Sequence, residues 1–182
     1  MKKRKNTVQM VIILGIAVVG ALGLFMRGDS KNQTGEGGKK FPPAAQFELK
    51  DATGKKVRLS DFAGKVVVLH FWAAWCPPCV EETPVLIAAM KRYSGTDLQL
   101  VAVSTDETWK DAFEVWPRKL DDSNIHSLLD PKSETAGKYG SYEFPETYII
   151  GRDQKILAKW VGPQDWNSPQ VVSYLQAVLS KP

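Results

Sequence analysis

Two cysteines three positions apart, placed directly after a long apolar run, constrain the fold of this 182-residue chain more than any other feature. The run is Val66–Trp72, and the pair lies in Trp75-Cys76-Pro77-Pro78-Cys79. Residues three apart on a helical turn have Cβ atoms about 5–6 Å apart, and a disulfide needs them at roughly 3.8 Å. The pattern therefore predicts a buried strand followed by a helix whose first turn closes into a disulfide or opens into a dithiol.

The two cysteines are expected to have different roles. Cys76 is predicted at the N-cap of the helix, with Pro77 at the first helical position, where its preset φ and missing N–H are tolerated. A thiolate at Cys76 would be stabilised by the positive end of the helix dipole. Cys79 would lie one turn deeper. We therefore expect Cys76 to attack a disulfide of a partner and Cys79 to resolve the mixed disulfide.

A permanent disulfide and half of a zinc site are the alternatives to redox chemistry. Zinc takes four protein ligands, or three and a water. The sequence has only these two cysteines and two histidines, His70 and His126, which are far apart along the chain. A permanent bond closing so short a loop would stabilise the fold little. The spacing favours a reversible thiol–disulfide site with no bound metal.

The positive net charge of +4 belongs to the N-terminal leader. Residues 1–27 hold five of the 24 basic residues and none of the 20 acidic ones. The rest of the chain is close to neutral, so the charge does not indicate a nucleic-acid surface.

The leader has the pattern of a membrane anchor. Basic residues at positions 2–5 precede an almost wholly apolar stretch at 8–26, which is long enough to span a bilayer as a helix. The positive flank predicts a cytoplasmic N-terminus and an extracytoplasmic remainder. A cleaved signal peptide is the alternative, although Leu24-Phe25-Met26-Arg27 is a poor cleavage site.

This interpretation divides the chain into three parts. Residues 1–27 form a basic cytoplasmic tip and a single transmembrane helix, and residues 28–40 form a flexible linker rich in Gly, Ser, Lys and Asn. Residues 41–182 form the folded domain, on the periplasmic or extracytoplasmic side of a bacterial cytoplasmic (inner) membrane.

Alternation, apolar runs and turn residues predict the elements of that domain. We expect strands at 46–50, 56–59, 66–72, 98–103, 147–150 and 156–160. We expect a helical turn at 60–62 and helices at 76–93, 109–120, 132–139 and 168–179. The helix at 76–93 should be kinked at Pro84, and its buried face should hold Val80, Val85, Leu86, Ala89 and Met90. This order predicts an α/β fold with a mixed sheet covered by helices on both faces.

Several segments together are similar to one known family. They are the stretch from Phe71 to Cys79, Pro84, and Tyr139-Gly140 followed by Phe144-Pro145-Glu146-Thr147. Over residues 41–180 the chain resembles the membrane-anchored thioredoxin-fold proteins of the TlpA/DsbE-like group, and most closely its cytochrome c maturation members. The resemblance implies a thioredoxin fold with an N-terminal hairpin extension.

The resemblance also implies roles for residues near the cysteines. Pro145 would form a cis peptide bond that faces the cysteine pair. Without the resemblance, the sequence would also fit an ordinary proline at the start of a strand. Glu82, three residues after Cys79, would be a buried acid that moves protons, unless it is a solvated surface residue like Glu81. Glu146 would contact the substrate or tune the site, unless it is an exposed loop acid.

Further positions complete the predicted site. Trp75, Pro77, Pro78 and Phe144 are expected to contact the substrate. His70 occupies the place where many thioredoxins carry a buried aspartate, and a structural hydrogen bond is the favoured interpretation of this residue.

The sequence thus predicts a membrane-tethered thiol:disulfide oxidoreductase outside the cytoplasm, and the resemblance implies that it works in the direction of reducing protein disulfides. The expected partners are protein thiols and disulfides, with apocytochrome c as the client implied by the resemblance, and a thiol reductant in the membrane. No cofactor beyond the Cys76–Cys79 disulfide, no nucleic acid and a monomeric state are expected.

Two other functions remain as alternatives. A peroxiredoxin-like peroxidase would typically carry threonine where this chain has Ala73. A copper metallochaperone would use the cysteine pair for Cu(I). Such proteins generally add a histidine or methionine near the cis-proline loop, where this chain has Phe144, Glu146 and Thr147.

Overall fold

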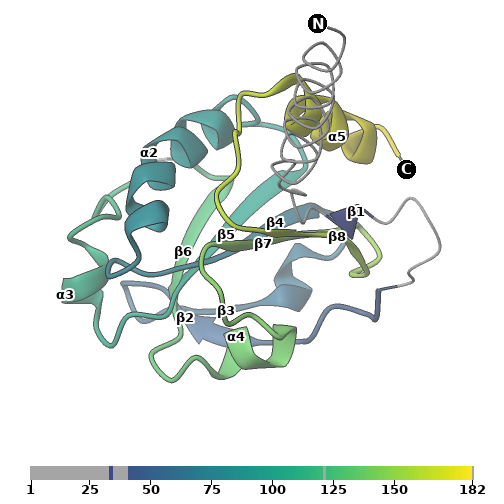
Figure 1. Ribbon diagram of the computed structural model, residues 1–182. Helices are drawn as coiled ribbons and strands as arrows, with labels where there is room; N and C mark the ends of the chain where they lie inside the picture. The colour runs from purple at the N-terminus through teal and green to yellow at the C-terminus, as the bar shows by residue number, and fades with distance from the viewer. Residues whose placement is uncertain (1–32, 35–40, 121, 182) are drawn as a thin grey trace, which may run out of the picture. The chain divides into compact units, whose positions relative to one another are not determined.

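The computed structural model describes residues 33–34, 41–120 and 122–181 of the chain. Its strands are β1 (Gln33–Thr34), β2 (Glu48–Lys50), β3 (Lys56–Arg58), β4 (Val66–Trp72), β5 (Leu98–Ser104), β6 (Ile125–Leu129), β7 (Glu146–Ile150) and β8 (Ile156–Val161). Its helices are the 3₁₀ turn η1 (Leu59–Phe62), α2 (Pro77–Lys91), α3 (Trp109–Ala112), α4 (Glu134–Tyr139) and α5 (Pro169–Leu179). Figure 1 shows their arrangement.

The strands of the described residues form one mixed sheet in the order β1-β8-β7-β4-β5-β6-β2-β3. Strands β4, β5 and β6 run parallel to one another, and β7, β8 and β1 extend the sheet antiparallel from β4. The β2–β3 hairpin joins the other side through β6. The predicted α/β class, mixed sheet and N-terminal hairpin are confirmed.

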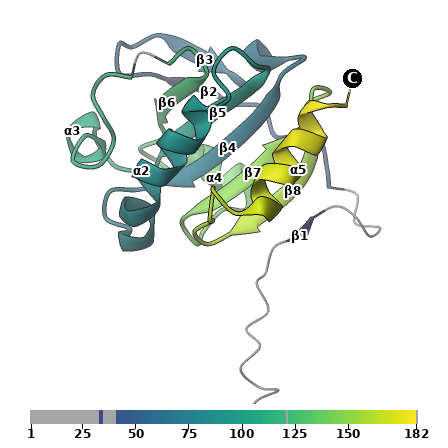
Figure 2. The ribbon, with the colours of Figure 1, turned by 90° about the horizontal axis from the view of Figure 1, so that it is seen from above.

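The central strand β4 is buried along its whole length because helices cover both faces of the sheet. Alternate β4 residues pack in opposite directions, since successive side chains of a strand point to opposite faces. Val66, Val68 and Trp72 share a core with α2 and α5. Val67, Leu69 and Phe71 share a second core with η1 and α4. Figure 2 shows α2 and α5 together on one face.

Helix α2 begins where the sequence predicts. Cys76 has the extended conformation of an N-cap residue, and prolines occupy the first two helical positions. The helix continues through Pro84 to Lys91.

The buried face of α2 differs in part from the predicted one. Leu86, Ala89 and Met90 are buried as expected, whereas Val80 and Val85 are each 39% exposed. The inward positions are 79, 82, 83, 86, 87, 89 and 90, which follow the 3.6-residue period of a helix. The positions of Val80 and Val85 lie beside this stripe, so their prediction as core residues was wrong.

The segment between β5 and α4 differs from the prediction in two ways. Strand β6 pairs parallel to β5 and was not predicted, because its residues alternate only weakly between apolar and polar. The helix predicted at 109–120 is limited to α3, which spans Trp109–Ala112. The chain then follows turns that bring Trp116 into the core, where its ring lies 5.4 Å from that of Trp72. A residue preceding proline, as Trp116 does, is disfavoured in a helix.

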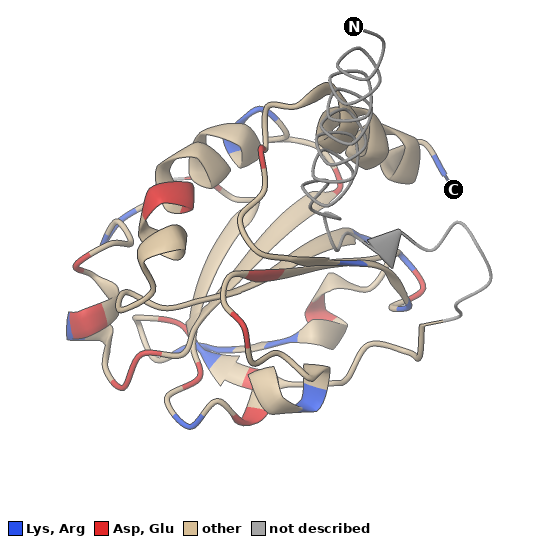
Figure 3. Cartoon of the chain, viewed as in Figure 1, with Lys and Arg blue, Asp and Glu red and all other residues tan. Residues whose placement is uncertain are grey.

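In the part of the chain that the structure describes, no helix is both long and apolar enough to cross a bilayer. The predicted basic tip and transmembrane helix at 1–27 lie outside the described residues, as does most of the predicted linker. Figure 3 shows that basic and acidic residues are interspersed along the described domain.

Candidate active site

The two cysteines form a disulfide at the N-terminus of α2, with their Cα atoms 5.3 Å apart. The Cys79 N–H points to the sulfur of Cys76 at 3.3 Å, so the first turn of the helix caps itself on the disulfide. Cys76 keeps 5% of its surface exposed and Cys79 keeps none. Only Cys76 can therefore be reached by a partner in this conformation.

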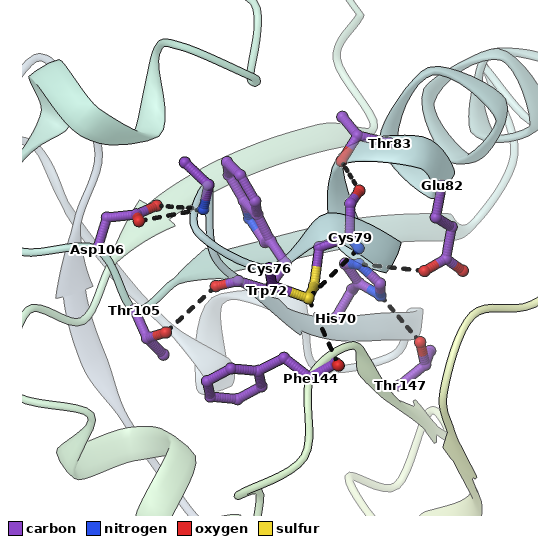
Figure 4. Close-up of a disulfide and its surroundings, with 11 residues drawn as sticks. His70, Trp72, Cys76, Cys79, Glu82, Thr83, Thr105, Asp106, Phe144 and Thr147 are labelled. Carbon is purple, nitrogen blue, oxygen red and sulfur yellow. Dashed lines mark hydrogen bonds and ion pairs between the residues drawn. A yellow bond between two sulfur atoms is a disulfide. The ribbon is translucent and has the colours of Figure 1, made fainter.

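The loop before β7 faces this disulfide. The Phe144–Pro145 peptide bond is cis, as the family pattern implied. The carbonyl oxygen of Phe144 lies 3.5 Å from the Cys76 sulfur (Figure 4). Because an oxidised sulfur carries no hydrogen, this is a contact that a Cys76 thiol could turn into a hydrogen bond.

Aromatic and proline side chains surround the reachable sulfur. Trp75 is 67% exposed, and its ring lies 5.9 Å from that of the half-buried Phe144. Pro77 and Pro78 are exposed on the first turn of α2. The structure thus brings four of the predicted substrate-binding residues to one rim, and their role in binding stays a prediction.

Glu146, the fifth predicted substrate-binding residue, lies inside the protein. It is 3% exposed, so the interpretation as an exposed loop acid was wrong. Its carboxylate accepts a hydrogen bond from the hydroxyl of Ser141 and lies 3.0 Å from Nζ of Lys159. The hydroxyl of Tyr148, which donates to the Tyr139 carbonyl at 2.6 Å, also lies 3.3 Å from this carboxylate. These contacts anchor the start of β7 immediately after the cis-proline.

Glu82 is buried beside the second cysteine on the inner face of α2. Its Oε1 accepts hydrogen bonds from the Gln164 N–H at 2.9 Å and from Nε1 of Trp166 at 2.5 Å. Burial outweighs these bonds and raises the pKa of Glu82 from 4.5 to about 7. The solvated alternative is wrong for Glu82, whereas its neighbour Glu81 is exposed.

His70, on β4, is fully buried between Glu82 and β7. Its Nδ1 is 2.9 Å from the hydroxyl oxygen of Thr147, and its Nε2 is 4.0 Å from Oε2 of Glu82 (Figure 4). Burial lowers the pKa of His70 to about 3, so the imidazole is neutral at pH 7. The contact with Glu82 is therefore not an ion pair between charged groups at neutral pH, although its distance would allow one.

Asp106 is a site residue that the sequence did not indicate. Both of its carboxylate oxygens accept from the Ala74 N–H at 3.1 Å, and the Ser104 hydroxyl donates to it at 2.7 Å. It thereby fixes the turn between β4 and Cys76. Asp106 follows the end of β5, and the parallel strands β4 and β5 end at the same edge of the sheet. Its position after β5 was therefore the one feature of the sequence that could have placed it near the cysteines.

Together these groups can carry out thiol–disulfide exchange. The site offers one cysteine that keeps some exposed surface, one fully buried cysteine three residues away, and a buried carboxyl whose pKa lies near neutrality. In such an exchange a thiolate attacks a disulfide sulfur and a second thiol resolves the mixed disulfide.

The comparisons with known proteins agree with this chemistry. Residues 38–159 match the model of the AhpC/TSA family. The thiol-disulfide oxidoreductase ResA of Bacillus cereus is 30% identical over 177 residues, which cover 96% of this chain and 98% of the relative. The thioredoxin-like protein YneN of Bacillus subtilis is 34% identical over 122 residues, covering 65% of this chain and 69% of that protein.

A solved structure shows the same fold. A protein of Chlorobium tepidum, assigned as thiol:disulfide interchange protein DsbE, superimposes with a TM-score of 0.69. The match has 32% sequence identity and covers 78% of this chain and 99% of that one.

Proposed function

Because this chain belongs to the AhpC/TSA family and is a thiol–disulfide oxidoreductase, we propose that it reduces disulfides of client proteins outside the cytoplasm while anchored in the membrane. The observation that carries this proposal is the asymmetry of the disulfide. Cys76 is reachable beside an exposed aromatic residue and the cis-proline loop, whereas Cys79 is sealed beneath it. Such an arrangement suits a polypeptide client that lies across the rim.

The proposed reaction has two steps. The Cys76 thiolate attacks one sulfur of the client disulfide, forms a mixed disulfide and releases the other client sulfur as a thiolate. Cys79 then loses its proton to Glu82 and attacks the Cys76 sulfur, which breaks the bond to the client. Both client thiolates take protons from water, so the client leaves with two thiols, and the protein keeps the Cys76–Cys79 disulfide. A membrane thiol donor would return two electrons and two protons to it.

The anchored location is supported by the sequence of the N-terminal segment. Basic residues followed by a 19-residue apolar stretch at 8–26 have the pattern of a signal anchor. The alignment with the Bacillus cereus protein extends over 96% of this chain, which is further than the folded domain alone. Fractionation of cells that express the full chain should recover it with the membranes, and its domain should be cleaved by protease added from outside.

The client we propose is apocytochrome c, whose haem-binding cysteines must be thiols before haem is attached. This assignment is supported by the resemblance of residues 144–147 to the cytochrome c maturation group. It predicts that loss of the protein lowers the amount of mature cytochrome c and that an added reductant restores it.

Trapping tests the proposed activity directly. A Cys79→Ala variant should accumulate mixed disulfides through Cys76, and the trapped proteins identify the clients. A Cys76→Ala variant is the matched control and should trap none, because Cys79 is unreachable. Trapping through Cys79 instead would contradict the assigned roles. A peroxide-consuming activity would favour the peroxidase alternative, and tight one-to-one Cu(I) binding that blocks exchange would favour the metallochaperone.

A further inference from the structure

His70 and Glu82 each direct toward the other one atom that has no hydrogen-bond partner. Nε2 of His70 and Oε2 of Glu82 are both buried and have no hydrogen-bond partner, and they are 4.0 Å apart. A displacement of about 1 Å would bring them within hydrogen-bond distance. The two residues come from β4 and α2, on either side of the same core, so the fold places these atoms together.

The other atoms of both side chains are already fixed. Oε1 of Glu82 accepts two N–H groups, so a proton on this carboxyl must be carried by Oε2. The ring of His70 is held by Thr147 through Nδ1. When the Thr147 hydroxyl donates to Nδ1, the neutral imidazole carries its hydrogen on Nε2, where it points toward Oε2.

We propose that His70 is a positioning residue for the exchange reaction: held by Thr147, it donates Nε2–H to Oε2 of ionised Glu82 and thereby sets how readily Glu82 takes the proton of Cys79. This inference rests on the proposed role of Glu82 as proton acceptor. It assigns to His70 and Thr147 a joint effect on the second step of the exchange. It also connects the start of β7, two residues after the cis-proline, to the proton acceptor on α2.

The proton balance of this step is simple. The Cys79 thiol passes its proton to Oε2, and the thiolate formed attacks the Cys76 sulfur. The bond between Cys76 and the client breaks, and the client sulfur leaves as a thiolate that takes a proton from water. His70 stays neutral throughout and gives up its hydrogen bond when Oε2 becomes protonated.

The surroundings leave His70 as the group best placed to tune Glu82. Gln164 and Trp166, from the segment before α5, donate to Glu82, and Thr147 of β7 contacts His70. Cys79 precedes Glu82 by three residues on the buried side of α2. Among the described residues, no lysine or arginine lies within ion-pair distance of Glu82. A hydrogen bond to a carboxylate is stronger than one to a neutral carboxyl, so His70 favours the ionised form.

The decisive measurement is the titration of Glu82 in the oxidised full-length protein, followed by the ¹³C signal of its carboxyl carbon. Glu82→Gln identifies the signal by removing it. His70→Leu should raise the midpoint by about one pH unit, the difference between a charged and a neutral hydrogen bond. His70→Gln, which keeps an N–H donor, should restore most of the shift. Thr147→Val should move the midpoint in the same direction by less.

A matched control and a second readout separate the possible outcomes. His126→Gln alters the other histidine, which lies two strands away on β6, and should leave the midpoint unchanged. An unchanged midpoint in both His70→Leu and Thr147→Val would overturn the inference. Release of the second client thiolate, followed by stopped flow, tests Glu82 separately. If its pH dependence is the same in Glu82→Gln as in the natural protein, the proton-accepting role fails, whatever the His70 variants show.

Discussion

Replacing Glu82 by glutamine should change how the stability of the oxidised protein depends on pH. Glutamine has the same shape and keeps the oxygen that accepts from Gln164 and Trp166. It removes the titration of a carboxyl whose folded-state pKa is about 7 instead of 4.5. The variant should therefore lose a pH dependence while keeping the two hydrogen bonds that Oε1 accepts.

The sign and size of the effect follow from linkage. Because burial raises the pKa of Glu82, the folded state binds more protons than the unfolded state between pH 4.5 and about 7. The contribution to stability is complete below the unfolded pKa and is lost as the pH rises through the folded one. At about 1.4 kcal/mol for each pKa unit, the natural protein should lose about 3 kcal/mol of unfolding free energy that the variant keeps.

His70 opposes this trend in both proteins. Burial lowers its pKa to about 3, so its contribution to stability is present above pH 6.5 and is lost as the pH falls toward 3. The difference between the natural protein and Glu82→Gln at each pH removes most of this background. That difference, and not the stability of either protein alone, is the quantity to compare.

Urea titrations of both proteins from pH 4.5 to pH 8, with the disulfide kept oxidised, would measure it. Glu81→Gln is the matched control, because Glu81 is the exposed neighbour on the same helix. It should follow the natural protein at every pH. Parallel curves for the natural protein and Glu82→Gln over this range would refute the argument that burial sets the proton affinity of Glu82.

Three further predictions test other parts of the site. Trp75→Ala should slow exchange with a protein disulfide about tenfold but exchange with oxidised glutathione less than about twofold, by stopped flow, because an exposed tryptophan anchors a polypeptide. Asp106→Ala should lower the unfolding free energy in urea by about 1–3 kcal/mol, and Asp106→Asn by less, since it keeps one acceptor for the Ala74 amide; equal losses would contradict this role. Lys159→Met should cost about 2–3 kcal/mol of thermal stability by leaving buried Glu146 without its cation, and adding Glu146→Gln should recover most of it.

The parts of the fold that could be predicted are those with a local signal. The apolar run of β4 and the start of α2 with its two prolines are each encoded by consecutive residues, and both predictions were confirmed. Strand β6 lacks such a signal, because it becomes a strand by pairing with β5 and β2. The chain after α3 is held by Trp116 in the core, which overrides the helical pattern of its neighbours.

The residues of the site also differ in whether a local sequence signal could predict them. The cysteine spacing is local and predicted the disulfide, whereas the cis-proline came only from the family pattern. The burial of Glu82 depends on Trp166, which is 84 positions away along the chain, and His70 meets Thr147 across 77 positions. Contacts of that separation leave no trace in the spacing of either residue's neighbours, so they required coordinates.

The borders of the sheet restrict how another polypeptide can associate with it. An unpaired strand border offers free N–H and C=O groups to any extended chain. On one side, β1 covers β8 at Ala158 and Lys159, and Pro43 forms a bridge to Lys155. On the other, β3 is only three residues long and carries Lys56 and Arg58. Self-association through added strands is therefore discouraged on both sides of the sheet, so the exposed rim around Cys76 can contact another polypeptide without the sheet borders adding strands to it.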